Sequence, residues 1–149
     1  MRRICLTLVA ATACYPTTTR PDLTPLPAAT RIELELDVAA ATRLVALELD
    51  TDSIPVARTE PKDGWLETEW FNPVTLAPVR GRPLGHDAVK VRAFVDPGRP
   101  NHSNVQIEVV ERRVVNPAMP GRELEQVVDG GHPVMLRVLR AVGRMQVEK

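Results

Sequence analysis

Alternating apolar and polar positions predict most of the strands in this chain. Residues 31–37 carry an apolar side chain at every second position and a charged one between, which is the period of a half-buried strand. The same alternation runs through 88–95 and 103–115, on either side of a turn that begins at Asp96-Pro97-Gly98. We therefore expect 88–95 and 103–115 to pair as an antiparallel hairpin.

Two segments have helical spacing. Residues 38–50 follow Asp37, whose side chain suits a helix N-cap, and a final helix is expected to begin at Pro133, because proline is favoured in a first turn. The apolar stripes comprise Val38, Ala41, Thr42, Val45 and Leu49 in the first helix and Met135, Leu139, Val142 and Met145 in the second. The charged residues expected to face solvent are Arg43, Glu48, Arg137, Arg140 and Arg144.

A second strand pair is expected between the helices. A strand from Ile54 to Thr59 contains Pro55, which is typical of an edge strand. The turn at 60–64 ends in Asp-Gly and leads into a return strand at 65–71. Aromatic side chains occupy both faces of that return strand, so the pattern leaves open which face is buried.

The remaining segments complete the predicted fold. Residues 72–87 contain three prolines and two glycines and predict a long loop, a class that is often functional. Residues 123–128 are interpreted as a short helical piece. The result is a single α+β domain at 31–149, an antiparallel sheet with two helices on one face, in the order β-α-β-β-β-β-α.

The first residues have the pattern of an export signal. Arg2 and Arg3 precede a short apolar run, and small residues follow it up to Ala13 and Cys14. The run is too short to cross a bilayer core of about 30 Å. Ala13-Cys14 resembles the lipobox of bacterial lipoproteins, although Ala11 stands where Leu is commonest. On that resemblance, residues 1–13 are interpreted as a lipoprotein-type signal peptide and Cys14 as the lipidated residue. Ordinary secretory cleavage and a buried N-terminal strand are the alternatives.

Residues 14–30 then read as a Pro/Thr-rich tether. Four prolines fix φ and remove backbone donors, which predicts an extended, semi-rigid spacer. At about 3.1 Å per residue such a spacer would reach roughly 50 Å from the membrane. The alternative is a disordered leader without a spacing role. Tyr15 after Cys14 favours delivery to the outer membrane, because Asp there resembles an inner-membrane retention signal.

Composition narrows the chemistry. The formal net charge is zero, and no basic cluster of the kind that nucleic-acid binding needs is visible. Both cysteines lie within the first 14 residues, so the domain has no disulfide framework and no thiolate metal site. The histidines, His86, His102 and His132, lie in separate predicted loops and show no metal-binding spacing. The sequence therefore predicts neither a catalytic site nor a cofactor.

The aromatic residues and loop arginines are the candidates for a partner surface. Exposed aromatic side chains anchor protein partners, which makes Trp65, Trp70 and Phe71 candidates, and Arg80 and Arg82 supply a small basic patch in the long loop. The preferred interpretation, however, places at least two of the aromatics in the core and treats the arginines as scattered surface charge. Glu67 and Glu69 share a strand face and are interpreted as its solvent side rather than as an acid/base pair.

The chain resembles small bacterial envelope lipoproteins. The segment DGWLETEW at 63–70, with helix 38–50 before it and a hairpin and last helix after it, looks most like domains of outer-membrane assembly lipoproteins of the BamC type. The long loop at 72–87 and the extra strand at 31–37 depart from that pattern. The resemblance implies an accessory, protein-binding role at the outer membrane, and only Cys14, as the acylation site, carries over.

Two function hypotheses follow. The first is a non-enzymatic, lipid-anchored module that binds another envelope protein through a sheet face, an edge strand or the 72–87 loop. The second is a carrier or sensor of a small apolar or lipidic ligand held between sheet and helices. A large dry pocket beneath helix 38–50 would favour the ligand, whereas a filled core with Trp65 or Phe71 exposed would favour the partner.

Overall fold

A computed structural model describes residues 18–80, 88–113, 116 and 118–147. Strands and helices follow one another in nearly the predicted order. Their bounds are β1 Thr30–Leu34, α1 Val38–Thr51, β2 Val56–Glu60, the 3₁₀ turn η1 Pro61–Asp63, β3 Trp65–Thr68, β4 Val89–Pro97, β5 Ser103–Glu111, the 3₁₀ turn η2 Gly121–Leu124, β6 Gln126–Val127 and α2 Pro133–Val147.

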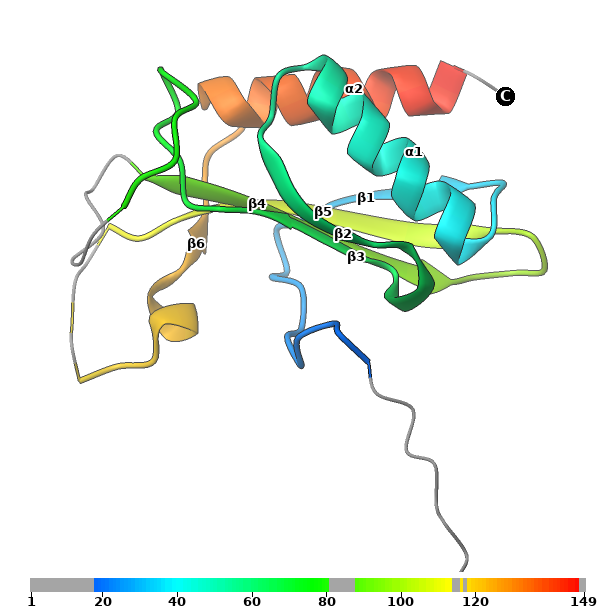
Figure 1. Cartoon of the computed structure of the whole chain (residues 1–149), viewed down its shortest axis with the longest axis horizontal. Coiled ribbons are helices and arrows are strands. Elements are labelled where there is room, and N and C mark those ends of the chain that lie inside the picture. The colour runs from blue at the N-terminus through cyan, green and yellow to red at the C-terminus, as the bar shows by residue number, and fades with distance from the viewer. Residues whose placement is uncertain (1–17, 81–87, 114–115, 117, 148–149) are drawn as a thin grey trace, which may run out of the picture.

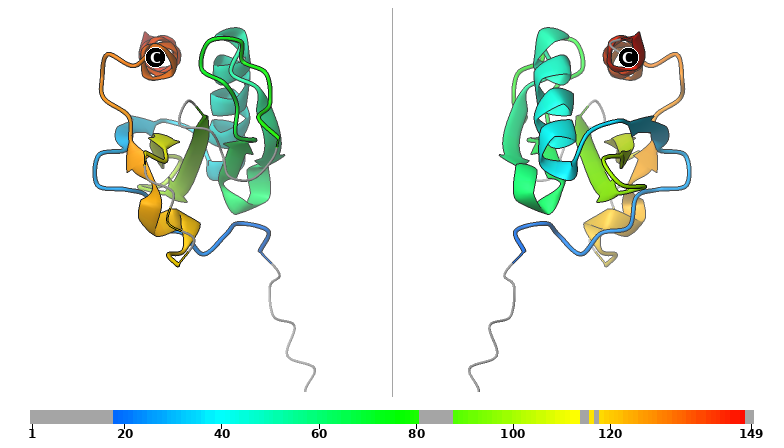
Figure 2. Two further views of the ribbon diagram at one scale, coloured as in Figure 1. Left: turned by 90° about the vertical axis from the view of Figure 1, so that its left-hand side faces the viewer. Right: turned by 90° about the vertical axis from the view of Figure 1, so that its right-hand side faces the viewer.

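The strands form one antiparallel sheet in the order β1-β5-β4-β3-β2, and the short β6 pairs with the far end of β5. Both helices lie on the same face of this sheet (Figures 1 and 2). The predicted α+β architecture is therefore confirmed, with β6 as an added element. The edge position of β2, which Pro55 indicated, is also confirmed.

Helix α1 begins as its sequence predicts. The Asp37 side chain accepts the N–H of Ala40 at 2.8 Å, which satisfies one of the amides that a helix leaves unpaired at its start. Its buried stripe includes Ala41, Val45 and Leu49, each fully inaccessible to solvent. The stripe packs onto the sheet and anchors α1 there.

The turn between β2 and β3 requires its glycine. The 3₁₀ turn η1 ends at Gly64, whose φ of 62° lies in the left-handed region that favours glycine. The Gly64 carbonyl accepts the N–H of Val95 at 2.8 Å, so the turn lies close against β4. A Cβ built on Gly64 would lie 2.0 Å from the Val95 carbonyl oxygen. Both the conformation and the space demand glycine here.

The layer between helices and sheet is a filled apolar core. Alternation along β4 and β5 sends every second side chain into this layer, as the sequence predicts. Its fully buried members include Val45, Leu49, Ile54, Leu66, Phe71, Val91, Val105, Val109, Val134 and Val138.

Several local predictions need correction. Residues 126 and 127 form strand β6 rather than part of a helical piece at 123–128, because they pair with β5. Leu139 is 42% exposed, and Val138 takes the expected core place on α2. Glu48 is buried rather than solvent-facing: its carboxylate accepts a hydrogen bond from Arg144 of α2, which also reaches Asp52 at 2.6 Å. The contact between the two helices therefore includes an ionic seam.

Candidate functional site

The second face of the sheet, opposite the helices, carries many polar and charged side chains of β4 and β5. Alternation places residues such as Arg92, Phe94 and Asp96 of β4 on this face, together with Asn104, Gln106 and Glu108 of β5. Residues 18–29, here called the strap, and the η2 segment lie below this face, away from the helices (Figure 1). We call it the strap-side face.

The first part of the strap is fixed at one end of the sheet. The backbone N–H and the hydroxyl of Thr19 both donate to the Asp63 carboxylate, at 2.7 and 2.5 Å. The Arg20 guanidinium donates to Asp96 at 2.7 Å and lies 5.4 Å from the centre of the Phe94 ring. These bonds hold the strap against the end of β4.

The second part of the strap is held by its backbone. The N–H of Leu26 donates to Glu108 Oε2 at 3.0 Å, and the carbonyl of Thr24 accepts from Arg122 Nη2 at 2.6 Å. Ala29 is 8% exposed where the chain enters β1. Residues 19–29 therefore contact the domain, and this part of 14–30 does not form the extended, semi-rigid spacer that was expected. Residues 14–17 lie outside the described residues.

A cluster of five charged side chains lies beneath the strap. Arg92 donates to both carboxylate oxygens of Glu125, at 2.6 and 3.1 Å, and to Glu108 at 3.1 Å. Arg122 bonds the same two carboxylates at 2.7 and 2.9 Å, and Arg112 reaches Glu125 at 2.9 Å. The side chains of Glu108 and Glu125 are 0% and 1% exposed. Burial of these charges is tolerated because each carboxylate has several cationic donors.

Within the cluster, the pKa values of Glu125, Arg92 and Arg122 are shifted in the direction that favours their charged forms. Burial by itself would raise the pKa of Glu125, but its hydrogen bonds and charge interaction with Arg92, together with Arg122 and Arg112, lower that pKa to about 2. Burial would lower the pKa values of Arg92 and Arg122, and the two carboxylates outweigh it and raise them. A general acid or base works best with a pKa near the operating pH, so Glu125 is placed to fasten η2 and the strap rather than to exchange protons.

The structure buries some of the predicted partner-surface residues and leaves others at least partly exposed. Trp65 and Phe71 are fully buried, which confirms the interpretation that at least two of the aromatic side chains belong to the core and removes both from the candidate partner surface. Trp65 packs edge-on against Phe94 with ring centres 4.9 Å apart, because its side of β3 faces the strap. Trp70 is half-buried, with the Arg112 guanidinium 4.8 Å from its ring centre. Arg80 is exposed, and Arg82 lies outside the described residues.

Other candidate residues have structural places. Glu67 bonds Lys90 at 2.9 Å, whereas Glu69 is exposed, so the two do not act as a pair. His102 contacts the Pro100 carbonyl in the turn before β5, and the ring of His132 lies 3.2 Å from the Val134 nitrogen at the start of α2. Within the described residues, no group of three or more His, Cys, Asp or Glu side chains is arranged to hold a metal. His86 lies outside those residues.

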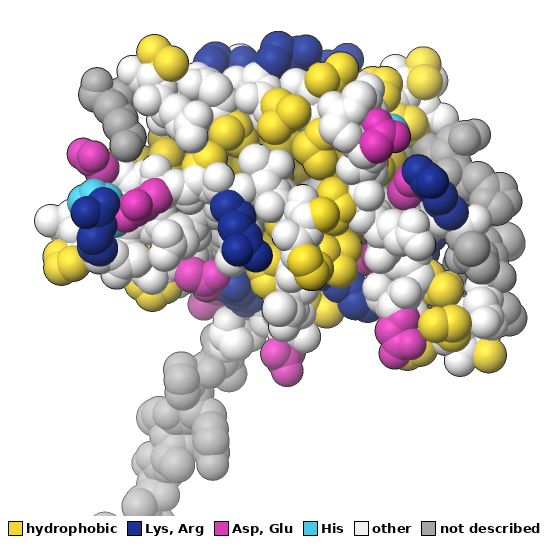
Figure 3. Space-filling view, turned by 180° about the vertical axis from the view of Figure 1, so that it is seen from behind, with side chains coloured by type: hydrophobic (Ala, Val, Ile, Leu, Met, Phe, Trp, Pro, Cys, Tyr) yellow, Lys and Arg dark blue, Asp and Glu magenta, His cyan; other side chains and the backbone are white. Residues whose placement is uncertain are grey.

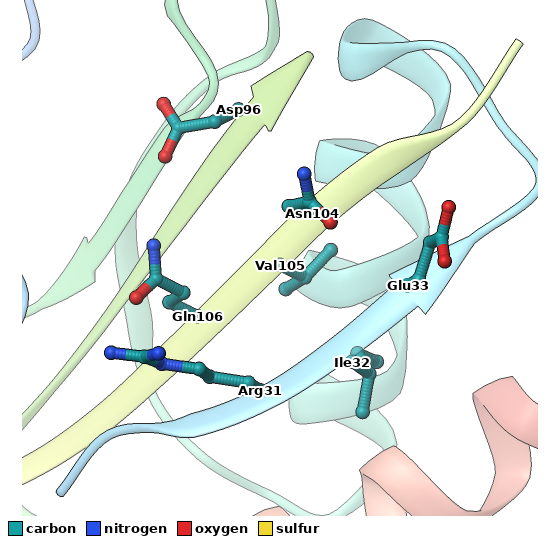
Figure 4. A pocket seen from close by; sticks show the side chains of 7 residues that line it. All are labelled: Arg31, Ile32, Glu33, Asp96, Asn104, Val105 and Gln106. Atoms are coloured by element: carbon teal, nitrogen blue, oxygen red, sulfur yellow. The ribbon is translucent and has the colours of Figure 1, made fainter. Parts of the chain in front are cut away.

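A shallow groove of about 600 Å³ lies on the strap-side face beside the strap. It runs over β1 and β5 and reaches Asp96 of β4 (Figure 4). Arg31 and Glu33 form one side of it, and Asn104 and Gln106 point up from β5. No sequence signal singled these residues out, because alternating polar residues on a strand also describe an ordinary solvent face.

A second surface feature lies on the outer side of α2. Leu136, Leu139 and Val147 are 46%, 42% and 82% exposed, and a hollow lies beside Gly143 and Val147. From behind, Lys and Arg side chains gather along the helix-layer edge of the molecule, with hydrophobic atoms exposed near them (Figure 3). This surface is an alternative contact site to the groove.

No protein-family model matches the chain, and no curated protein is significantly similar to it. Among the described residues, no helix has the length and hydrophobicity needed to span a membrane.

Proposed function

We propose that this chain is a lipid-anchored protein of the bacterial outer membrane whose domain is a non-enzymatic protein-binding module. Cys14 is the acylated residue, and the domain faces the periplasm. The observation that carries the proposal is the strap, which begins to bind the domain at Thr19, only five positions after Cys14. A segment bound to the domain in this way would fix the position of the domain relative to a lipid anchor at Cys14.

The strap would hold the domain close to the membrane. Five residues span at most about 18 Å when fully extended. Since Thr19 is bound to Asp63 at the strap-side face, an acyl chain at Cys14 would keep that face near the lipid and turn the helices away from it. The proposed module is therefore membrane-proximal, in place of the long spacer that the composition predicts.

A filled core supports protein binding over ligand carriage. The layer beneath α1 is occupied by fully buried residues such as Val45, Leu49 and Ile54. Both the groove beside the strap and the hollow on α2 are open surface features. Because Trp65 and Phe71 are buried, the partner surface would lie at one of these two features instead.

The anchor is tested by Cys14→Ser in intact cells. We expect the substitution to abolish labelling with a fatty-acid analogue and to move the protein from the membrane fraction to the soluble periplasmic fraction, because the thiol is the site of acylation. Cys5→Ser is the matched control and should leave both measurements unchanged. Continued acylation or membrane association in the Cys14 variant would defeat the proposal.

A further inference from the structure

Two cross-strand rows of polar side chains form the groove. Arg31 lies opposite Gln106, and Glu33 lies opposite Asn104, in the pairing of β1 with β5. Asp96 of β4 extends the second row on the other side of Asn104. Figure 4 shows these five side chains on one face, with Ile32 and Val105 pointing away from it. These five side chains form the polar floor of the groove in two rows, and we call this floor the platform.

The two amides in the platform match an extended main chain. Asn104 and Gln106 are two positions apart on β5, about 6.6–6.8 Å along the strand, which is also the two-residue repeat of an extended peptide. A side-chain amide offers both a donor and an acceptor, as a peptide group does. Within the part of the chain that the structure describes, neither amide has a hydrogen-bond partner of its own.

The same face already binds a proline-rich segment, namely the strap, which turns at Pro21–Leu23 and again at Leu26–Ala29. Glu108 accepts the N–H of Leu26, and Arg122 donates to the carbonyl of Thr24, so the strap is recognised through its main chain. Glu108, Gln106 and Asn104 follow one another on the same face of β5. The groove therefore lies along the same row of β5 side chains, between Glu108, which binds the strap, and Asn104, whose neighbour Asp96 bonds Arg20 of the strap.

The charges of the groove indicate the composition of the occupant. Glu33 bonds Arg99 at 3.0 Å and Asp96 bonds Arg20 at 2.7 Å, so both carboxylates are compensated. Arg31 is exposed and makes no ion pair within the described residues. The uncompensated charge is therefore positive and lies at one end of the amide row. An acidic side chain is its natural partner.

From these observations we propose that the groove binds an extended peptide segment of a partner envelope protein, with an Asp or Glu side chain placed against Arg31. The peptide main chain lies along Asn104 and Gln106, and the segment runs beside the strap. The inference rests on the proposed function and deepens it, because it gives the binding module a site and a class of ligand.

The test uses paired synthetic peptides. Twelve-residue Pro/Thr-rich peptides that differ only by Asp or Asn at one position are titrated into the ¹⁵N-labelled full chain carrying Cys14→Ser. We expect the Asp peptides to shift the amide signals of 31–33 and 104–106, and the Asn peptides to bind about tenfold more weakly, a loss of about 1.4 kcal/mol. Arg31→Glu should weaken binding of the Asp peptides at least as much. Arg43→Glu, an exposed arginine on α1, is the matched control and should bind as the parent chain does.

Each other outcome overturns the inference. One such outcome is that none of the peptides shifts the groove signals. Another is that the shifts fall on Leu136, Leu139 and Val147, which would place the contact on α2. A peptide of residues 18–29 that binds the groove, together with self-association of the chain, would identify the occupant as a second copy. Failure here leaves acylation at Cys14 untouched, and loss of acylation would leave peptide binding measurable, so the two proposals fail separately.

Discussion

At the scale of single residues, Arg92 is the centre of the strap-side face. It lies on the central strand β4, and its guanidinium bonds carboxylates from β5 and from the segment after η2. An unpaired charge buried at this depth would destabilise the fold by several kcal/mol. Removing one partner of a buried ion pair leaves the other charge in that state. Glu125 is the partner whose loss should be most informative, because Arg92, Arg122 and Arg112 all donate to it.

The pH dependence of stability should therefore change in Glu125→Gln. A carboxyl whose pKa falls from 4.5 unfolded to about 2 folded contributes stability above about pH 4.5, and loses it as the pH falls toward 2. The difference corresponds to about 3 kcal/mol. We expect urea unfolding at pH 7 to show the variant less stable by about that amount, and its stability to fall less than that of the parent between pH 4.5 and 2.

Glu123→Gln provides the comparison for that measurement. Glu123 is exposed two positions earlier and makes no hydrogen bond through its side chain within the described residues. Its substitution should change the free energy of unfolding by less than about 0.5 kcal/mol. Equal effects of the two substitutions would show that the ionic cluster does not stabilise the fold.

At the scale of elements, the β2–β3 connection shows how a turn fixes a sheet. The register of the two strands depends on the tight turn through η1 and Gly64, which also receives the N–H of Val95 from β4. The turn therefore joins three strands rather than two. The Asp-Gly signal in the sequence located this turn correctly.

Gly64→Ala should destabilise the domain by about 3 kcal/mol. The substitution combines a positive φ with a Cβ that would overlap the Val95 carbonyl, and backbone atoms there cannot move cheaply. Thermal unfolding compared with Gly130→Ala checks this expectation, because a Cβ at Gly130 meets nothing within 4 Å. A Gly64 variant as stable as the Gly130 variant would contradict the account of the turn.

At the scale of the whole molecule, the strap binds a stretch before β1 to parts of the domain that lie much later in the sequence. Its contacts connect the N-terminal segment with β4, β5 and η2, which are far from it in sequence. A pull on the proposed lipid anchor at Cys14 would reach the domain first through these bonds. Arg122 is central here because it binds the strap carbonyl and both buried carboxylates.

Arg122→Ala should loosen the strap while leaving α1 intact. We expect hydrogen exchange at the amides of 22–29 to accelerate by roughly tenfold or more, because the variant loses charged hydrogen bonds that hold this segment. Exchange within α1 should stay close to that of the parent chain. Arg113→Ala is the control, since the Arg113 side chain is exposed and, among the residues that the structure describes, bonds only Glu111. Unchanged exchange in the strap would show that Arg122 does not hold it.

Local patterns predicted the helices and strands well and the surface poorly. Asp37, Pro133 and the alternation in β4 and β5 act within a few residues, so their consequences are readable along the chain. Glu48 and Leu139 were misplaced, because their exposure depends on where the other helix crosses. The groove and the ionic cluster escaped sequence reasoning because only the tertiary structure brings β1 and the η2 segment beside the predicted β4–β5 hairpin.

The sequence by itself determined that this chain forms an antiparallel sheet with two helices on one side, and which side chains of β4 and β5 face those helices. Periodicity carries that information, because burial against a helix repeats at a fixed spacing. Only the tertiary structure decided what covers the opposite face. The strap lies there because Glu108, Arg122 and Asp63 converge from three separate segments to bind its backbone, and no local pattern encodes such a convergence.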